Sequence, residues 1–113
     1  SRIALIGFSL GGNVTLVYLG KKGSQLASEI VKSVVFSVPC DLRASSLELA
    51  RPGNIIYMKR FLALLHKKIQ AKMRLFPGQI NDRGYRLIKN FHDYDARYTA
   101  PLHGFNNAED YWA

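Results

Sequence analysis

The stretch Gly7-Phe8-Ser9-Leu10-Gly11-Gly12 decides how this chain folds. It follows the apolar run 3–6, which begins with a β-branched residue and is typical of a strand buried in a parallel sheet. Residues 13–19 then have the pattern of a helix, which we expect to end at Gly20. The glycine-rich stretch is therefore predicted to turn the chain sharply from a strand into a helix.

This stretch has the form G-x-S-x-G, in which a serine stands at the tip of a strand-to-helix turn. Glycines two positions before and two positions after Ser9 are expected to make room around its strained backbone, and Gly12 is expected to let the helix pack closely on the strand. The turn predicts Ser9 as a nucleophile and the backbone N–H of Leu10 as a donor to an oxyanion. The alternative is a glycine–serine turn with only a structural role. A phosphate-binding loop is disfavoured, because neither G-x-x-x-x-G-K-[ST] nor G-x-G-x-x-G is present here.

Length and composition limit what the chain can be. It has 113 residues, whereas a complete sheet of this kind usually needs roughly 200–250 residues, so we expect an internal fragment of a larger α/β protein. The formal net charge of +8 predicts a basic patch. The single cysteine, Cys40, is interpreted as a small buried thiol and excludes an internal disulfide. The sequence contains no run of about 20 apolar residues, so no transmembrane helix is predicted in it.

A second buried strand is predicted over residues 34–38, where Pro39 ends it. A strand, a helix and a strand at this spacing form a βαβ unit with parallel strands. Chemistry in such sheets collects at the carboxyl ends of the strands, where Ser9 and Asp41 lie. Asp41 has two interpretations: the N-cap of a following helix, which we favour, or the acid of a catalytic triad.

Residues 55–76 predict a long amphipathic helix, preceded by a helix over 46–50 and ended by Pro77-Gly78. Its apolar residues recur at steps of three and four: Ile55, Met58, Phe61 or Leu62, Leu65, Ile69, Met73 and Phe76. Its other faces are basic and carry Lys59, Arg60, His66, Lys67, Lys68, Lys72 and Arg74. No acidic residue occurs between Leu49 and Asn81, so much of the positive charge is concentrated here.

Three interpretations of this basic helix stay open. It is a solvated helix that covers the core, a cap with its apolar face toward an acyl pocket, or a membrane-surface contact. The membrane contact would use Lys59, Arg60, Lys67 and Lys68. We expect no nucleic-acid partner, because the interleaved aromatic and basic residues of a nucleic-acid reader are not evident.

The last third of the chain is polar and aromatic. A short helix is predicted over residues 85–91 and an ordered loop over 99–105, and residues 108–112 begin a further element. The spacing in His92-Asp93-Tyr94-Asp95 matches no pattern of metal ligands, so no metal site is predicted.

Several separated motifs together resemble the YheT-like branch of the α/β-hydrolase superfamily, which includes embryogenesis-associated plant proteins and animal abhydrolase-domain proteins. The motifs are Gly-Phe-Ser-Leu-Gly-Gly-Asn at residues 7–13, Ser-Val-Pro-Cys-Asp-Leu at 37–42, Tyr57-Met58 with Arg-Phe-Leu at 60–62, and Thr-Ala-Pro-Leu-His-Gly-Phe at 99–105 before Ala-Glu-Asp-Tyr at 108–111. The resemblance spans nearly the whole chain.

This resemblance implies a partial α/β-hydrolase domain over residues 1–113. Residues 1–42 would form the core βαβ unit with its nucleophile elbow, and residues 43–113 a mostly helical, cap-like insertion. The implied activity is that of a serine esterase or lipase acting on carboxylic esters, including lipid esters, with Ser9 as nucleophile and Leu10 as backbone oxyanion donor. No cofactor and no metal are implied.

The same resemblance places the triad acid and histidine beyond Ala113, and neither His92 nor His103 is assigned as the base. Without its base a serine hydroxyl is a poor nucleophile, so this segment alone would be inactive. The alternative function is a non-catalytic basic module that binds anionic membrane surfaces.

Overall fold

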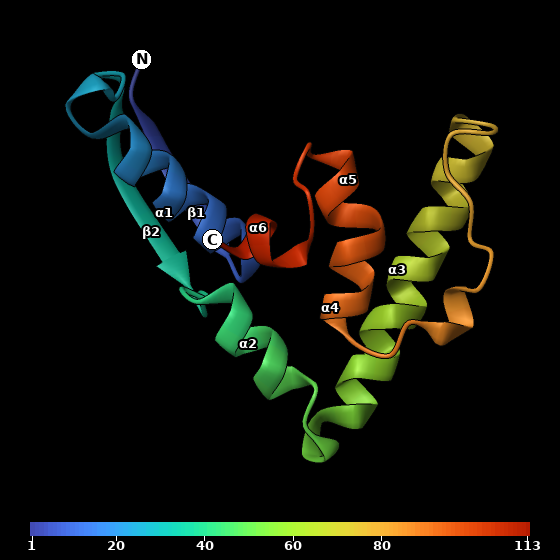
Figure 1. Cartoon of the computed structure of the whole chain (residues 1–113). Helices are drawn as coiled ribbons and strands as arrows, with labels where there is room; N and C mark the ends of the chain where they lie inside the picture. The colour runs from blue at the N-terminus through green and yellow to red at the C-terminus, as the bar shows by residue number, and fades with distance from the viewer. The chain divides into compact units, whose positions relative to one another are not determined.

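The computed structural model describes all 113 residues, and the chain divides into two compact units, Ser1–Asp41 and Leu42–Ala113 (Figure 1). The mixed α/β class expected from the sequence is confirmed, because a parallel pair of strands is accompanied by helices along most of the chain. The role of the second unit as a cap-like insertion stays a prediction. None of the helices is long and apolar enough to span a bilayer.

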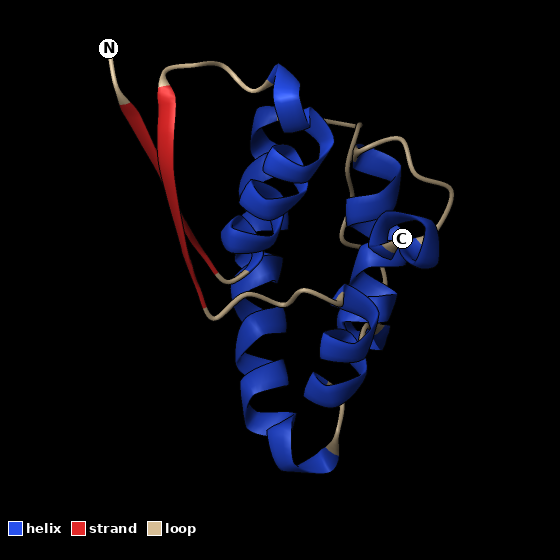
Figure 2. Ribbon diagram, turned by 90° about the vertical axis from the view of Figure 1, so that its left-hand side faces the viewer, coloured by secondary structure: helices blue, strands red, loops and turns tan.

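The first unit consists of β1 (Ile3–Phe8), α1 (Leu10–Lys22), the 3₁₀ turn η1 (Gly23–Gln25) and β2 (Ile30–Phe36). The two strands pair in parallel, with Phe8 opposite Phe36, and form the sheet drawn in red in Figure 2. The rings of these two phenylalanines stack with their centroids 5.0 Å apart. The strand–turn–helix path around Ser9 is therefore joined to a second strand that runs in the same direction.

Two predicted boundaries in this unit are wrong. α1 continues through Gly20 to Lys22 and is ended by Gly23, whose φ of 47° is readily adopted by glycine. The second strand spans residues 30–36 instead of 34–38, because Ser37 has a φ of 50° and leaves the extended conformation before Pro39 is reached.

The strands were expected to be buried, and in this chain they are not. Ile6 is 64% exposed and Phe8 is 66% exposed, and apolar residues of β2 are also exposed. The sheet has only two strands, so each strand has a neighbour on one edge only. Burial in a parallel sheet requires neighbours on both edges and covered faces.

The second unit consists of α2 (Leu42–Leu49), the turn η2 (Pro52–Asn54), α3 (Ile55–Leu75), the turn η3 (Tyr85–Leu87), α4 (Phe91–Tyr94), the π-helical turn η4 (Asp95–Thr99), α5 (Ala100–Leu102) and α6 (Ala108–Trp112). The long helix predicted over 55–76 is confirmed within one residue as α3. Its core-facing residues are Met58, Leu62 and Ile69, which pack with Tyr85, Ile88 and Tyr98. The sequence pattern allowed either Phe61 or Leu62 in the core, and the structure buries Leu62 and leaves Phe61 44% exposed.

The helix predicted over 85–91 is reduced to the 3₁₀ turn η3, and the loop predicted over 99–105 is helical as far as Leu102. Asn90 is an N-cap: its side chain accepts from the backbone N–H of Asp93 at 2.9 Å, and the Asp93 carboxylate accepts from the N–H of Lys89 at 2.9 Å. This reciprocal arrangement starts a helix at Phe91, which continues through η4 into α5. The helical run thus covers most of the segment predicted to be a loop.

Candidate active site

Ser9 lies at the turn between β1 and α1 with a φ of 50° and a ψ of −124°. A residue with a side chain is strained in this region, which glycine adopts more readily. Its backbone N–H donates to the carbonyl of Phe36 on β2 at 2.9 Å. Its own carbonyl accepts from the N–H groups of Gly12 at 2.9 Å and Asn13 at 3.2 Å. These backbone bonds hold the strained residue between the sheet and the helix, with its side chain exposed.

Two glycines allow β1 and α1 to approach at this turn. A Cβ atom on Gly7 would lie 2.6 Å from Gly12 Cα and 2.7 Å from the carbonyl oxygen of Gly11. A Cβ atom on Gly12 would lie 2.6 Å from a methyl group of Val38. A Cβ atom on Gly11 would meet nothing within 4 Å. The prediction of tight space at Gly7 and the prediction of close helix–strand packing at Gly12 agree with this geometry, whereas the prediction that Gly11 makes room is wrong.

Leu10 is the first residue of α1, so its backbone N–H has no acceptor within the helix. The aligned peptide dipoles of this 13-residue helix add a positive potential at the same end. Ser9 and Leu10 are therefore brought together at a place that favours negative charge.

The structure adds two residues that sequence reasoning missed. Ser37 follows β2 as Ser9 follows β1, has the same positive φ of 50°, and is also exposed. Asn13 donates from its side chain to the carbonyl of Pro39 at 2.9 Å and so ties α1 to the segment after β2. No sequence pattern signals the backbone of Ser37. Asn13 belongs to the motif at residues 7–13, but its hydrogen bond joins residues 26 positions apart, which the motif does not signal.

The other residues predicted near this edge are Cys40 and Asp41. Cys40 is exposed, so its interpretation as a buried thiol is wrong, because it lies in the short irregular segment between β2 and α2. Asp41 directly precedes α2, which is the position of an N-cap. Its capping role stays a prediction.

The first unit contains no histidine, and its only acidic residues are Glu29 and Asp41. Ser9 therefore has no candidate base within its own unit. The three histidines of the chain, His66, His92 and His103, all belong to the second unit.

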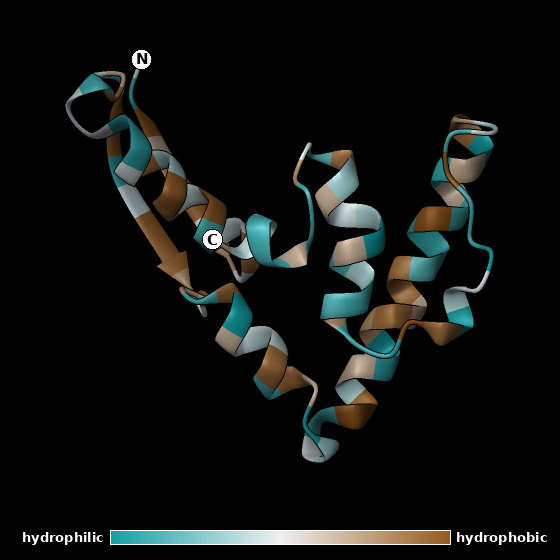
Figure 3. Ribbon diagram, viewed as in Figure 1, coloured by the Kyte–Doolittle hydropathy of each residue, from teal (hydrophilic) through white to brown (hydrophobic).

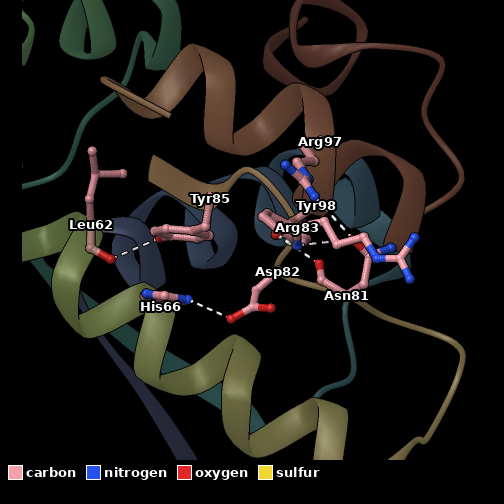
Figure 4. A network of polar contacts seen from close by, with 8 residues as sticks. All are labelled: Leu62, His66, Asn81, Asp82, Arg83, Tyr85, Arg97 and Tyr98. Atoms are coloured by element: carbon pink, nitrogen blue, oxygen red, sulfur yellow. Dashed lines mark hydrogen bonds and ion pairs between the residues drawn. The ribbon is translucent and has the colours of Figure 1, made fainter. Parts of the chain in front are cut away.

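Two of these histidines form pairs with carboxylates. The Nε2 atom of His66 lies 2.9 Å from an oxygen of Asp82, and its ring stacks on Tyr85 with centroids 4.0 Å apart (Figure 4). The Nε2 atom of His92 lies 2.7 Å from an oxygen of Glu109. In each pair the hydrogen bond from the histidine lowers the pKa of the carboxyl group.

The remaining groups around the first pair are structural. Burial raises the pKa of Tyr85 to about 12, and its hydroxyl donates to the carbonyl of Leu62 at 2.8 Å. Tyr98 donates in the same way to the carbonyl of Asn81 at 2.9 Å (Figure 4). In this structure no group of three or more His, Cys, Asp or Glu side chains is placed to hold a metal ion.

Comparison with known proteins gives relatives that match almost the whole chain. The chain is 31% identical over 111 residues to YheT of Escherichia coli (strain K12), which is provisionally named an esterase, and the match covers 96% of this chain and 32% of YheT. It is 31% identical over 107 residues to Phospholipase ABHD3 of Mus musculus and 28% identical over 107 residues to the Homo sapiens protein, each match covering 94% of this chain and 26% of the relative.

The chain is homologous to these α/β-hydrolases. The resemblance inferred from the separated motifs is thereby confirmed. The chain spans about a third of the length of YheT and about a quarter of that of ABHD3. No family model and no solved structure matches it.

Proposed function

We propose that Ser9 is the nucleophile of a serine hydrolase that cleaves carboxylic esters, including lipid esters. The observation that carries the proposal is the conformation of Ser9, which is held exposed and strained between a parallel strand and the first turn of a helix. Strain of this kind is concentrated at functional sites. The esterase and phospholipase names of the relatives support the class of substrate.

In the proposed reaction the Ser9 hydroxyl oxygen attacks the ester carbonyl and its proton passes to a histidine. The carbonyl oxygen becomes an oxyanion, which accepts a hydrogen bond from the backbone N–H of Leu10. Collapse of this intermediate breaks the ester bond, and the leaving alcohol takes the proton from the histidine. Water then hydrolyses the acyl-enzyme by the reverse sequence of proton transfers. No metal or organic cofactor is needed.

The base has to come from outside the first unit, because that unit has no histidine. We propose that the histidine and the acid that orients it lie beyond Ala113, in the order serine, acid, histidine that α/β-hydrolases follow. On this proposal the residues described here supply the nucleophile and one oxyanion donor. The second unit is proposed as the cap-like insertion that follows the core.

The test is hydrolysis of a p-nitrophenyl ester by the whole protein and two variants. Ser9→Ala is expected to lower kcat/KM by about 1,000-fold or more, because the reaction then has no nucleophile. Ser37→Ala is the matched control, since Ser37 is an exposed serine with the same φ at the end of the neighbouring strand. We expect it to retain activity within about tenfold. Comparable activity of wild type and Ser9→Ala would contradict the proposal.

A second candidate, a non-catalytic basic module, is favoured by one observation: the cationic residues of α3 are exposed. It predicts that Ser9→Ala changes nothing measurable while membrane binding depends on α3. The two functions are compatible, so the binding surface is treated separately from the chemistry.

A further inference from the structure

α3 has a second apolar stripe on a side that does not face the core. Tyr57, Leu64 and Leu75 are separated by seven and eleven residues, which places them on one side of the helix. They are 65%, 48% and 72% exposed, whereas the three core residues of the same helix are at most 8% exposed. Figure 3 shows apolar and polar residues alternating along α3. Ile55 and Ile56 at the start of the same helix are also exposed, so the stripe is distinguished by its alignment along one side of α3 and not by its exposure.

Cations line both edges of this stripe. Arg60, Lys67 and Arg74 recur every seven residues, so they form a row along one edge. Lys68 and Lys72, one turn apart, follow the other edge. All five side chains are exposed and none forms an ion pair. No acidic residue lies between positions 50 and 81, so nothing along this part of the chain neutralises them.

We propose that this surface, hereafter the outer face of α3, docks on membranes that contain anionic phospholipids. It consists of Tyr57, Leu64 and Leu75 with the cations Arg60, Lys67, Lys68, Lys72 and Arg74. A helix that lies in a membrane interface has an apolar stripe that enters the acyl boundary and flanking cations at the level of the phosphates. The outer face of α3 has this arrangement, and the net charge of +8 attracts the chain to a negative surface.

The geometry refines the set of residues expected from the sequence. Lys59 is turned by about 100° from Arg60 on a helix and so lies away from the stripe. Arg74 and Lys72 belong to the face instead. Phe61 marks its boundary, because its ring packs against Phe91 with centroids 5.6 Å apart. The face therefore runs along the outer side of the helix from Tyr57 to Leu75.

A nucleic acid is the competing polyanion, and the apolar stripe argues against it. Phosphate contacts need cations and gain nothing from exposed leucines. A membrane uses both components, since the burial of apolar side chains adds to the attraction of the cations. The inference goes beyond the proposed hydrolase and does not depend on Ser9.

The experiment is co-flotation of the whole protein with vesicles of phosphatidylcholine, alone or with about 30% phosphatidylserine. Each cation at an anionic surface contributes about fivefold in affinity, so Arg60→Gln/Lys67→Gln/Arg74→Gln should bind about 100-fold more weakly. Leu64→Ser/Leu75→Ser should bind at least about tenfold more weakly without any change in charge. Ser9→Ala should bind like wild type, which separates this test from the test of the hydrolase.

Two variants serve as controls. Lys21→Gln/Lys22→Gln/Lys32→Gln removes the same charge from the first unit and should lose less than about threefold. Arg60→Lys/Lys67→Arg/Arg74→Lys keeps the charge and should bind like wild type, with circular dichroism verifying that each variant is folded.

The proposal is overturned by any of four results. These are no binding of wild type to anionic vesicles, equal binding to pure phosphatidylcholine, an equal loss in the first-unit control, or full binding by the Leu64/Leu75 variant. Competition by duplex DNA that depends on the same cations but not on the leucines would assign the face to nucleic acid and would also overturn it.

Discussion

Replacing Gly7 with alanine would place a methyl group 2.6 Å from Gly12 Cα, 2.7 Å from the Gly11 carbonyl oxygen and 2.8 Å from Gly12 N. All three atoms belong to the backbone of the first turn of α1, so no side-chain rotation relieves the contact. Overpacking costs typically 1–3 kcal/mol, and contact with backbone places this site at about 3 kcal/mol or more. Gly11→Ala is the matched control, because its methyl group meets nothing within 4 Å.

Gly11 lies in α1, where alanine is favoured over glycine by up to about 1 kcal/mol. The two variants should therefore differ by about 3–4 kcal/mol, which is two to three orders of magnitude in the folding equilibrium. Urea unfolding of the whole protein measures this difference. With a slope of about 2 kcal/mol per M, the midpoint of Gly7→Ala should lie at least about 1.5 M below wild type, and that of Gly11→Ala at or slightly above it.

The reasoning would be refuted by equal midpoints for the two variants, or by a larger loss for Gly11→Ala. Failure of Gly7→Ala to fold while Gly11→Ala folds is the limiting case of the expected result. The comparison tests the packing of β1 on α1, on which the position of Ser9 depends.

Three further predictions concern stability. Ser9→Gly should be more stable than Ser9→Ala by about 1 kcal/mol, because the strain that glycine relieves at this positive φ exceeds the entropy that glycine adds to the unfolded state. At Ser45, inside α2, alanine should instead be more stable than glycine. Thermal melts of the four variants measure both differences. The hydrogen bond from His66 lowers the pKa of Asp82 in the folded protein below its ordinary value of 3.8. The stability that this hydrogen bond adds to the folded state is therefore complete above pH 3.8 and is lost as the pH falls through the pKa of Asp82 in the folded protein. The stability difference between wild type and Asp82→Asn should therefore shrink on acidification, and a difference that grows would show the sign to be wrong. Tyr85→Phe should cost about 1 kcal/mol in urea unfolding, because it removes the hydrogen bond that the Tyr85 hydroxyl donates to the carbonyl of Leu62 on α3.

Much of this fold follows from local sequence patterns. The turn at Ser9 is set by glycine spacing after an apolar run, and α3 is set by a helical period that 21 residues sustain. The centre of α3 was therefore predicted closely, down to the buried Met58 and Ile69. A periodic pattern of this length determines the helix largely independently of the residues that pack against it.

The failures have different physical causes. The positive φ of Ser37 is imposed by the path of the chain after β2, and no residue type at that position signals it. The helix that starts at Phe91 depends on the side chains of Asn90 and Asp93 acting together, which a search for apolar periodicity does not detect. The open space beside Gly11 depends on which residues surround that position in the fold, and the spacing of the glycines in the sequence does not reveal it.

The central claim is that the Ser9 hydroxyl forms a covalent intermediate. The most direct measurement treats the whole protein with a fluorophosphonate probe and maps the modified residue by mass spectrometry of its peptides. We predict one stoichiometric adduct, on Ser9, that disappears in Ser9→Ala and persists in Ser37→Ala. An adduct on any other residue, or labelling that survives Ser9→Ala, would contradict the account.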